Sequence, residues 1–308
     1  MDLIIQVEKL AKAYGTTIAV DNISFNVHAG EIFGMVGPNG AGKSTTIECL
    51  EGLRRPDRGS VRVMGLDPVF QEKLLRPQLG VQLQHANLPE RIKVWEALDL
   101  YASFYPHPLD WRILLEQLGL VEKRNTMFRK LSGGQKQRLF IALALINDPQ
   151  VIFLDELTTG LDPQARHASW DMVRAIRERG KTVFMTTHFM EEAERLCDRV
   201  AIMEQGRIVA LDTPANLIRD LKAENRVSFS VEGALAASGL SALPHVARVE
   251  TLGDKTVVYG RAHDGQAPLV SEVIHFLTAH GIRFSDLRTE QANLEDVFLA
   301  LTGRKIRE

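Results

Sequence analysis

The sequence Gly37-Pro38-Asn39-Gly40-Ala41-Gly42-Lys43-Ser44-Thr45 follows the apolar segment from Glu31 to Val36 and matches the pattern G-x-x-x-x-G-K-[ST]. Its three glycines let the backbone turn tightly, so that N–H groups point at phosphate oxygens beside the positive end of the helix that follows. We expect Lys43 to reach the β- and γ-phosphates of a nucleoside triphosphate, and Ser44 to ligate Mg²⁺. An ordinary glycine-rich turn would not need strand, loop, lysine and hydroxyl in this order.

A second informative segment is the apolar run Val151-Ile152-Phe153-Leu154, which ends in Asp155 and Glu156. The run predicts a strand that is buried on both faces and ends in two adjacent carboxylates. Because parallel strands present their carboxyl ends at the ligand crevice, Asp155 is expected to hold Mg²⁺ beside Ser44. Glu156 is then placed to orient or deprotonate the attacking water. A strand ending in solvated acids is the alternative, but the phosphate loop favours the catalytic interpretation.

Between these motifs lies Leu131-Ser132-Gly133-Gly134-Gln135, immediately before the helix-like run from Lys136 to Leu145. This pentapeptide resembles the signature of ATP-binding cassette (ABC) proteins, and its spacing ahead of the acidic strand is similar as well. A Ser-Gly-Gly turn that opens a helix offers a hydroxyl, free N–H groups and a helix N-terminus to an anion. The resemblance implies that this anion is the γ-phosphate of ATP held by the opposite subunit of a homodimer. An ordinary N-capped helix accounts for Ser132 alone.

Other motifs of that family fall at matching positions. Gln84 resembles the glutamine that links the metal and water to the partner-facing subdomain, although Gln82 is a competing candidate. Tyr14 resembles the aromatic residue that stacks on adenine, and a buried core tyrosine is the alternative. His188, after the strand-like segment from Thr182 to Thr187, resembles the switch histidine at the γ-phosphate. The loop Gly160-Leu161-Asp162 resembles the one that crosses the dimer interface.

One position departs from the family pattern, because Leu157 stands where a proline usually follows the catalytic glutamate. Proline would fix φ and remove an N–H, so leucine is expected to leave this turn freer. The carboxylates of Asp155 and Glu156 are unaffected. The sequence therefore still predicts an active ATPase with ATP and Mg²⁺ as its ligands.

Composition is ordinary for a globular enzyme: of 308 residues, 45% are hydrophobic and 25% are charged. The formal net charge of −2 indicates no basic surface for nucleic acid. Cys49 and Cys197 form no C-x-x-C pair, which suits a reducing compartment. The start lacks the features of a signal peptide, and the longest apolar run, Leu139 to Ile146, is far shorter than the roughly 20 residues of a membrane helix.

The order of segments predicts two domains. Strands and helices alternate up to about Val209, with a turn at Tyr14-Gly15. This order predicts an α/β phosphate-loop NTPase domain over residues 1–220, in which helices cover both faces of a parallel sheet. A helical subdomain is expected at about 88–145, where Trp95, Leu98, Tyr101 and Phe104 form its core or line a groove for a membrane partner. Residues 225–308 predict a small ferredoxin-like α+β domain in the order βαββαβ: strand 227–231, possible helix 234–240, hairpin 247–260 around Gly253-Asp254, helix 268–280, strand 282–287 and helix 293–302.

Two function classes follow from the resemblance. The first is the ATP-hydrolysing motor subunit of an ABC-type exporter, cytoplasmic and peripheral on the inner face of the cell membrane, which dimerises with ATP and couples to a separate permease. The tail from Asn293 to Arg304 is similar to that of stand-alone cassettes of drug- and polyketide-type exporters. The alternative is a soluble ABC ATPase without a transport role. Ribosome-associated cassettes usually carry two phosphate loops, and DNA-repair cassettes a long coiled-coil insertion, whereas this chain has neither.

Overall fold

The chain forms two compact units in a computed structural model that describes residues 2–84, 86–221, 225–231, 237–253, 255–260, 269–290 and 292–303. One unit ends at Pro214, and the other spans Ala215–Gly303. The division falls a few residues before the boundary that the sequence suggests. Pro214 is the first residue of helix α8, a position that its fixed φ and missing N–H favour.

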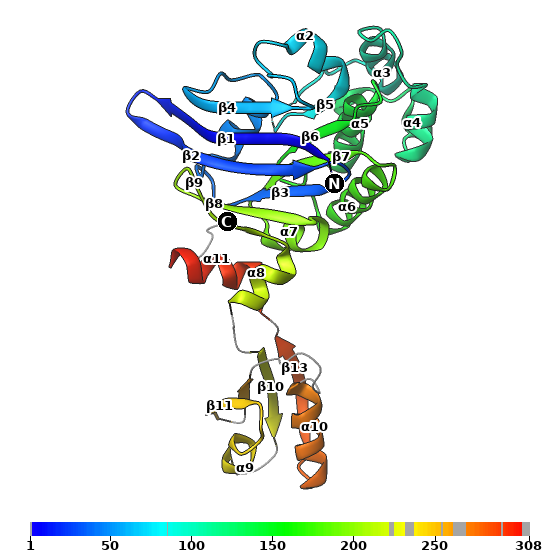
Figure 1. Ribbon diagram of the computed structural model, residues 1–308. Coiled ribbons are helices and arrows are strands. Elements are labelled where there is room, and N and C mark those ends of the chain that lie inside the picture. Colours follow the sequence, from blue (N-terminus) through cyan, green and yellow to red (C-terminus); the bar gives the residue numbers. More distant parts are fainter. Residues whose placement is uncertain are drawn as a thin grey trace. The chain divides into compact units, whose positions relative to one another are not determined.

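The first unit is built on a six-stranded sheet with the strand order β5-β6-β7-β3-β8-β9 (Figure 1). Its strands are β3 (Ile32–Val36), β5 (Leu79–Gln82), β6 (Val151–Asp155), β7 (Thr182–Thr187), β8 (Arg199–Glu204) and β9 (Arg207–Asp212). Strands β5, β6, β7, β3 and β8 pair in parallel, as predicted, and every side chain of β3, β6 and β7 is buried. Strand β9 is antiparallel to β8, because the two-residue turn Gln205-Gly206, with φ of 48° and 79°, reverses the chain.

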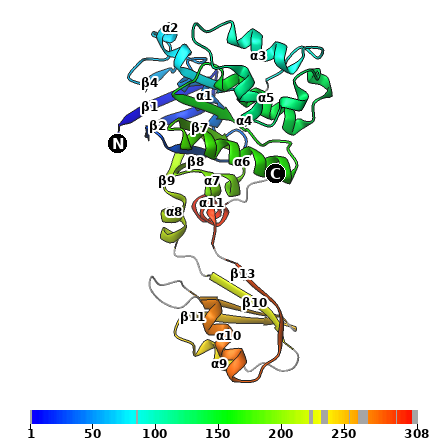
Figure 2. The ribbon, with the colours of Figure 1, turned by 90° about the vertical axis from the view of Figure 1, so that its right-hand side faces the viewer.

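A second sheet, antiparallel with the order β2-β1-β4, faces the first through helix α1. It contains β1 (Leu3–Tyr14), β2 (Thr17–His28) and β4 (Arg58–Val63), and the predicted turn at Tyr14-Gly15 joins its first two strands. Helix α1 (Lys43–Leu50) contacts β2 and β4 on one side and β6 and β7 on the other (Figure 2). One face of the parallel sheet is thus covered by a helix and a further sheet, not by helices alone.

The remaining helices of the first unit are α2 (Glu72–Leu75), α3 (Val94–Ala102), α4 (Trp111–Gln117), α5 (Gly133–Leu145), α6 (Pro163–Glu178) and α7 (Met190–Leu196), with 3-10 turns at Arg76–Gln78, Val121–Lys123 and Phe128–Lys130. Helices α3, α4 and α5 pack on one another, and α5 also packs on β5. Of the four predicted core positions in this segment, Leu98 is fully buried and Trp95 and Tyr101 are half-buried. Phe104 lies beyond the end of α3 and is 65% exposed, so the core interpretation is wrong for it.

The second unit contains α8 (Pro214–Asp220), β10 (Asn225–Val231), α9 (Ala237–Ser241), β11 (Val246–Leu252), β12 (Lys255–Gly260), α10 (Leu269–Ala279), β13 (Phe284–Glu290) and α11 (Leu294–Thr302). Its sheet has the order β11-β12-β10-β13 with antiparallel pairs throughout, which is the predicted ferredoxin-like arrangement. Val227, Phe229, Val258 and Val273 are among its buried core residues. The predicted positions 234–236, Asp254, Pro268 and 304–308 lie outside the described residues.

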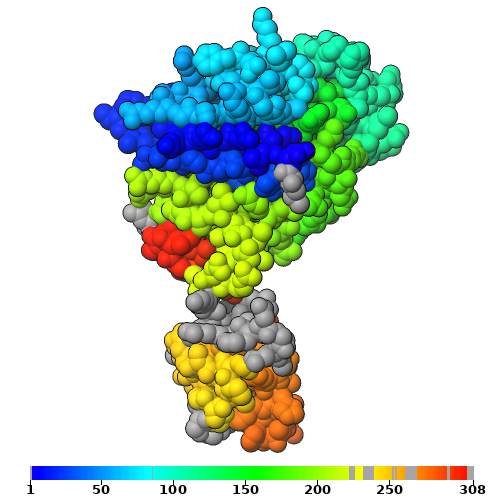
Figure 3. Space-filling model, in the orientation of Figure 1, coloured from blue at the N-terminus to red at the C-terminus, as the bar shows by residue number. Residues whose placement is uncertain are grey.

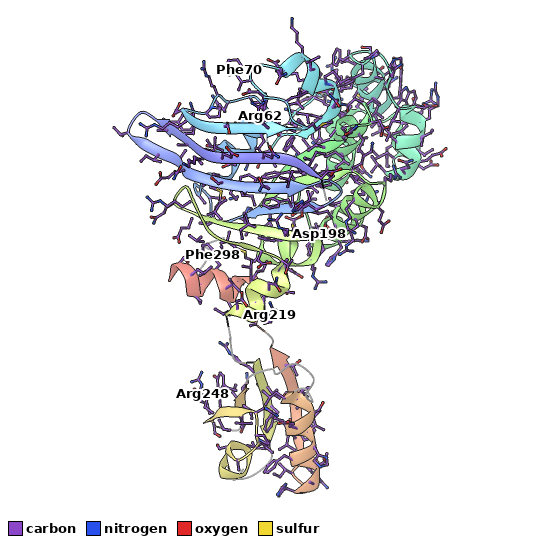
Figure 4. The ribbon with its side chains drawn as sticks, viewed as in Figure 1. Arg62, Phe70, Asp198, Arg219, Arg248 and Phe298 are labelled. Carbon is purple, nitrogen blue, oxygen red and sulfur yellow. The ribbon has the colours of Figure 1, made fainter. Side chains whose placement is uncertain are left out.

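Surface features complete the description of the two units. In the first, β1 lies at the surface in the space-filling view (Figure 3), and Phe70, just before α2, is 73% exposed with the Arg55 guanidinium 5.4 Å from its ring (Figure 4). In the second, the Arg248 guanidinium stacks 3.8 Å from the Tyr259 ring centroid. Among the described residues, no helix combines the length and the apolar character that a membrane span requires.

Candidate functional site

The glycine-rich loop after β3 needs glycine for steric reasons. Gly37 has a φ of 157°, and a Cβ atom there would come within 2.2 Å of the Met203 carbonyl oxygen. Gly42, the N-cap of α1, has a φ of 102°, and its Cβ atom would approach the Ala19 carbonyl oxygen to 2.3 Å. Neither position accepts a side chain without moving the backbone of a neighbouring strand. The loop is therefore held closely against β2 and β8.

The other residues of the loop differ in exposure. Asn39 and Gly40 are exposed, Pro38 and Thr45 are half-buried, and Ala41 is buried. The N–H of Ala41 donates to the Pro38 carbonyl at 3.2 Å, and the Ala41 carbonyl accepts from Gly206 N–H at 3.0 Å. The exposed tip therefore stands on a base that is fixed by main-chain hydrogen bonds.

Lys43 lies in the middle of the site with a side chain that is 3% exposed. Its Nζ donates to the carbonyl oxygens of Gly37 at 2.8 Å and Pro38 at 3.1 Å, and it lies 3.8 Å from Glu156 Oε1. Burial lowers the pKa of Lys43, while the charges of Glu156 and Asp155 oppose this shift. The ammonium group thus stands between the loop carbonyls and the two acids, where it can contact a phosphate.

Asp155 ends strand β6 and is 6% exposed. Its carboxylate accepts a hydrogen bond from the Thr186 hydroxyl, and the nearby Ser44 hydroxyl also favours the ionised form. Burial raises the pKa of Asp155, and the nearby charge of Glu156 raises it further, while both hydroxyls and Lys43 act in the opposite direction. The side-chain oxygens of Ser44 and Asp155 therefore lie close to each other. Hard oxygen ligands of this kind fit Mg²⁺, which usually takes one or two protein ligands together with phosphate oxygens.

Four side chains surround the Glu156 carboxylate, which is 6% exposed. Its Oε2 accepts from Gln84 Nε2 at 2.9 Å and from Thr159 Oγ1 at 3.2 Å. Its Oε1 lies 3.5 Å from His188 Nδ1 and 3.8 Å from Lys43 Nζ. Glu156 also has a φ of 50°, a left-handed conformation that is uncommon for a residue with a side chain and that clusters at functional sites. This arrangement presents one carboxylate to the space beside the phosphate loop.

The two glutamines of β5 and its following turn have different environments. Gln84 is exposed and reaches Glu156, as described above. Gln82 is 5% exposed, and its Nε2 donates to the adjacent Leu83 carbonyl at 2.8 Å. The structure therefore brings Gln84, and not Gln82, to the carboxylate.

The signature segment caps helix α5. Ser132 Oγ accepts from Gln135 N–H at 3.3 Å, and the Gln135 side chain accepts from Ser132 N–H at 3.0 Å, which forms a capping box. Ser132 and Gly133 are exposed, and Gly134 packs so closely that a Cβ atom would lie 3.0 Å from Ala165 Cβ. Within one chain these residues thus form a rigid, exposed helix start and do not join the cluster around Glu156.

The segment after Glu156 contains a buried side chain and the cap of the next helix. Leu157, in the turn that lacks the usual proline, is 1% exposed. Gly160 has a φ of 75° with open space around it, and Asp162 Oδ1 caps α6 by accepting from Ala165 N–H at 2.9 Å. Burial of Leu157 restricts its side chain, and the expectation of a freer backbone turn stays a prediction.

Tyr14 lies at the end of β1 and is 43% exposed, so the buried-core alternative is wrong. The Lys12 ammonium lies 5.7 Å and the Arg54 guanidinium 6.0 Å from its ring centroid. An accessible aromatic face between two cations fits a base with phosphates attached.

Sequence reasoning missed the threonines of this site. Thr186 bonds to Asp155, and it also accepts the Glu156 N–H through its carbonyl at 3.2 Å and its hydroxyl at 3.1 Å. Thr159 bonds to the Glu156 carboxylate. The available signal was the run Thr186-Thr187 at the end of a buried strand, and its use required the parallel register that pairs Asp155 with Thr186.

Comparison with known proteins adds to this geometry. The sequence pattern of the family described as "ABC transporter" matches residues 20–159. The Nod factor export ATP-binding protein I of Ralstonia nicotianae is 41% identical over 99% of this chain and 95% of its own length. A protein of the same name from Mesorhizobium japonicum is 42% identical over 97% of this chain and 86% of its own length.

Solved structures resemble a large part of this chain. One, described as an ATP-binding subunit of an ABC transporter, has a TM-score of 0.64 and 29% identity, and the match covers 71% of this chain and 93% of that one. Another, a dimeric ATP-binding cassette in a post-hydrolysis state with ADP and phosphate bound, has a TM-score of 0.61 and 27% identity over 68% of this chain and 98% of its own.

Proposed function

Since this chain belongs to the ABC transporter family of ATP-binding proteins and is the ATP-hydrolysing subunit of such a transporter, we propose that it drives export. Support comes from the relatives named for Nod factor export, which align with nearly the whole chain. The convergence of Gln84, Lys43 and His188 on the carboxylate of Glu156 is the observation that carries the assignment of the catalytic centre.

In this proposal each residue of the site has one task. Glu156 accepts a proton from the attacking water, and Gln84 orients the carboxylate. Lys43 contacts the β- and γ-phosphates and balances their charge, and His188 stands at the γ-phosphate side of Glu156. Ser44 and Asp155 would hold Mg²⁺, which neutralises charge that develops on the phosphate oxygens. Tyr14 stacks on the base.

The second half of each ATP site is proposed to come from another copy of the chain. Ser132, Gly133, Gly134 and Gln135 form an exposed helix start with N–H groups and a hydroxyl available to an anion. Closing this start over the phosphate loop of a partner would complete both sites of a homodimer. The dimeric cassette among the similar structures supports this arrangement.

A membrane-spanning permease is the partner proposed for transport, with this chain bound to its cytoplasmic side. The family supports the proposal, because an ATP-binding subunit of a transporter acts on a separate membrane part. Exposed apolar residues of the helical segment, among them Leu100 and Phe104, are available for such a contact.

The test is the variant Glu156→Gln, which keeps the shape of the side chain and removes the base. We expect turnover to fall at least about 100-fold, within the range for loss of a general base, while ATP affinity changes less than about threefold. The trapped ATP state should elute as a dimer in size-exclusion chromatography. Glu178→Gln, at an exposed position of α6, removes the same charge and should leave both properties unchanged. Turnover near the wild-type rate in Glu156→Gln would reject the catalytic assignment.

A further inference from the structure

Helix α7, which follows the switch histidine, carries a glutamate that is completely buried. Glu192 is 0% exposed, whereas Glu191, the residue before it, lies at the surface and pairs with Arg195 at 2.9 Å. Trp170 Nε1 of α6 donates to Glu192 Oε1 at 3.0 Å. Burying a carboxyl group costs free energy unless neighbouring polar groups form hydrogen bonds or ion pairs with it. The groups around Glu192 therefore indicate its role.

Two threonines face this carboxyl group from the two segments that carry the catalytic residues. Thr158 lies two residues after Glu156, and Thr187 lies directly before His188. Both hydroxyls act on the carboxyl group closely enough to favour its ionised form, although Oε2 of Glu192 and Oγ1 of Thr158 lack a well-aligned hydrogen bond. Both threonines are 1% exposed. The Glu192 side chain thus contacts both the turn after Glu156 and the segment that leads into His188, which we call the switch segment (residues 187–189).

Thr187 connects the same carboxyl group to the phosphate loop. The Thr187 carbonyl accepts from Gly37 N–H at 3.4 Å, and its hydroxyl accepts from Phe189 N–H at 3.0 Å. A displacement of Thr187 therefore changes the loop at Gly37 and the main chain on both sides of His188. Glu192 acts on this threonine as a fully buried group.

Arg166 adds a second link between α6 and the switch. Its guanidinium lies 4.2 Å from the Phe189 ring centroid, and the rings of Phe189 and His188 are 4.1 Å apart. Arg166 also attracts the Glu192 carboxylate, and its Nε is buried without a hydrogen-bond partner. Helix α6 begins directly after Asp162, the last residue of the loop 160–162. Arg166 and Trp170 of this helix therefore connect the loop to His188, through Phe189 and Glu192.

Burial raises the pKa of Glu192, and the hydroxyls of Thr187 and Thr158, the Trp170 indole and Arg166 oppose the shift. A protonated carboxyl group can accept from Trp170 through one oxygen and donate to a threonine through the other. Glutamine has the same shape with one acceptor and one donor side, so it can replace this form. Alanine supplies neither contact and leaves the Trp170 indole N–H without its buried partner.

We propose that Glu192 is a positioning residue for ATP hydrolysis, because it holds Thr158 and Thr187 and thereby fixes Glu156 and His188 relative to each other. The inference rests on the proposed function of Glu156 and His188. The same contacts connect the loop 160–162 to His188, because a movement of α6 would displace Glu192 through its hydrogen bond with Trp170.

The experiment compares Glu192→Gln and Glu192→Ala with Glu191→Gln and Glu191→Ala, all in the full chain. We expect Glu192→Ala to lower kcat at least tenfold with KM for ATP within threefold, and Glu192→Gln to stay within threefold of wild type. Both Glu191 variants should match wild type. Thr158→Val and Thr187→Val, which each replace a hydroxyl by a methyl group, should each lower kcat about threefold to tenfold.

A double-mutant cycle with His188→Ala shows whether Glu192 acts through the histidine. In the His188→Ala background, Glu192→Ala should lower kcat by a smaller factor than it does in wild type, because a histidine that is absent cannot be misplaced and only the effect on Glu156 remains. Full additivity, or a Glu192→Gln variant as inactive as Glu192→Ala, would overturn the proposal. If Glu192→Ala does not fold, the two valine variants and Glu192→Gln decide in the same way.

A spectroscopic readout separates this inference from the proposed function. The imidazole signals of His188, assigned by their loss in His188→Ala, should shift in Glu192→Ala and keep their positions in Glu192→Gln. Unchanged signals in Glu192→Ala would reject the positioning role even if turnover falls. Failure of Glu156→Gln to lower turnover would instead reject the proposed function, and the imidazole signals would still report on Glu192.

Discussion

Replacing Glu51 by glutamine should alter how the stability of the first unit depends on pH. Glu51 is the C-cap residue of α1 and is 5% exposed, and neither carboxyl oxygen has a hydrogen-bond partner. Burial raises its pKa to about 8, and the charges of Asp155 and Glu48 add to the shift. The negative end of the helix dipole also disfavours a carboxylate at this place. The folded chain therefore keeps a proton on Glu51 at neutral pH.

The size of the effect follows from proton linkage. In the unfolded chain Glu51 has its ordinary pKa of 4.5, so between pH 4.5 and about pH 8 the folded state binds one more proton than the unfolded state. Stability is thus fully present below the unfolded pKa and is lost as pH rises toward the folded pKa. Each pH unit in this window costs about 1.4 kcal/mol, or roughly 3 kcal/mol from pH 5.5 to pH 7.5. Glutamine does not titrate, so the variant should lack this part of the pH dependence.

Urea unfolding followed by tryptophan fluorescence measures this difference. All three tryptophans, Trp95, Trp111 and Trp170, lie in the first unit, so the signal reports on the unit that contains Glu51. The free energy of unfolding of Glu51→Gln, relative to wild type, should rise by roughly 3 kcal/mol between pH 5.5 and pH 7.5. Glu116→Gln, at an exposed position of α4, should give a difference that does not change with pH. Parallel pH profiles of Glu51→Gln and wild type would refute the reasoning.

Two further outcomes test the loop and the shared site. Gly42→Ala should lower the free energy of unfolding by more than the roughly 1–2 kcal/mol of a left-handed alanine, and should weaken ATP binding, because its Cβ meets the Ala19 carbonyl at 2.3 Å. Gly180 has a φ of 79° and open space around it, so Gly180→Ala should lower the free energy of unfolding, measured with urea, only by the cost of a left-handed alanine. Lys43→Ala and Ser132→Arg should each abolish ATPase activity, and a mixture of the two should recover part of it through one intact composite site. Exchange of chains without recovered turnover or ATP-driven dimers would contradict the shared site.

The parts of the site that could be predicted are those with strict local requirements. The left-handed φ at Gly42 and the close backbone contact at Gly37 leave glycine as the residue that fits. The loop can therefore be identified from its glycines in the sequence. A short apolar run that ends in Asp155 and Glu156 indicated a buried parallel strand, and the structure contains it as β6. Gln84 was chosen over Gln82 by resemblance, and the structure places Gln84 at Glu156.

The parts that could not be predicted depend on packing between distant segments. Glu191 and Glu192 are adjacent and identical in the sequence, yet one is exposed and the other is fully buried against Trp170. Glu51 lies at the end of helix α1, where a charged residue ordinarily points to solvent. The exposure of Tyr14 likewise depends on how the hairpin of β1 and β2 extends past its neighbours. Local patterns carry no information about which side of these segments the rest of the chain covers.

The strand order explains why the switch segment is the place where a buried link has the greatest effect. Strand β7 lies between β6, which ends in the acids, and β3, which leads into the phosphate loop. Thr186 consequently contacts Asp155 and Glu156 on one side, while Thr187 contacts Gly37 on the other. Any group that moves the end of β7 displaces the base and the phosphate contacts together. Glu192 acts on that strand end as a fully buried group, where solvent does not compete with it.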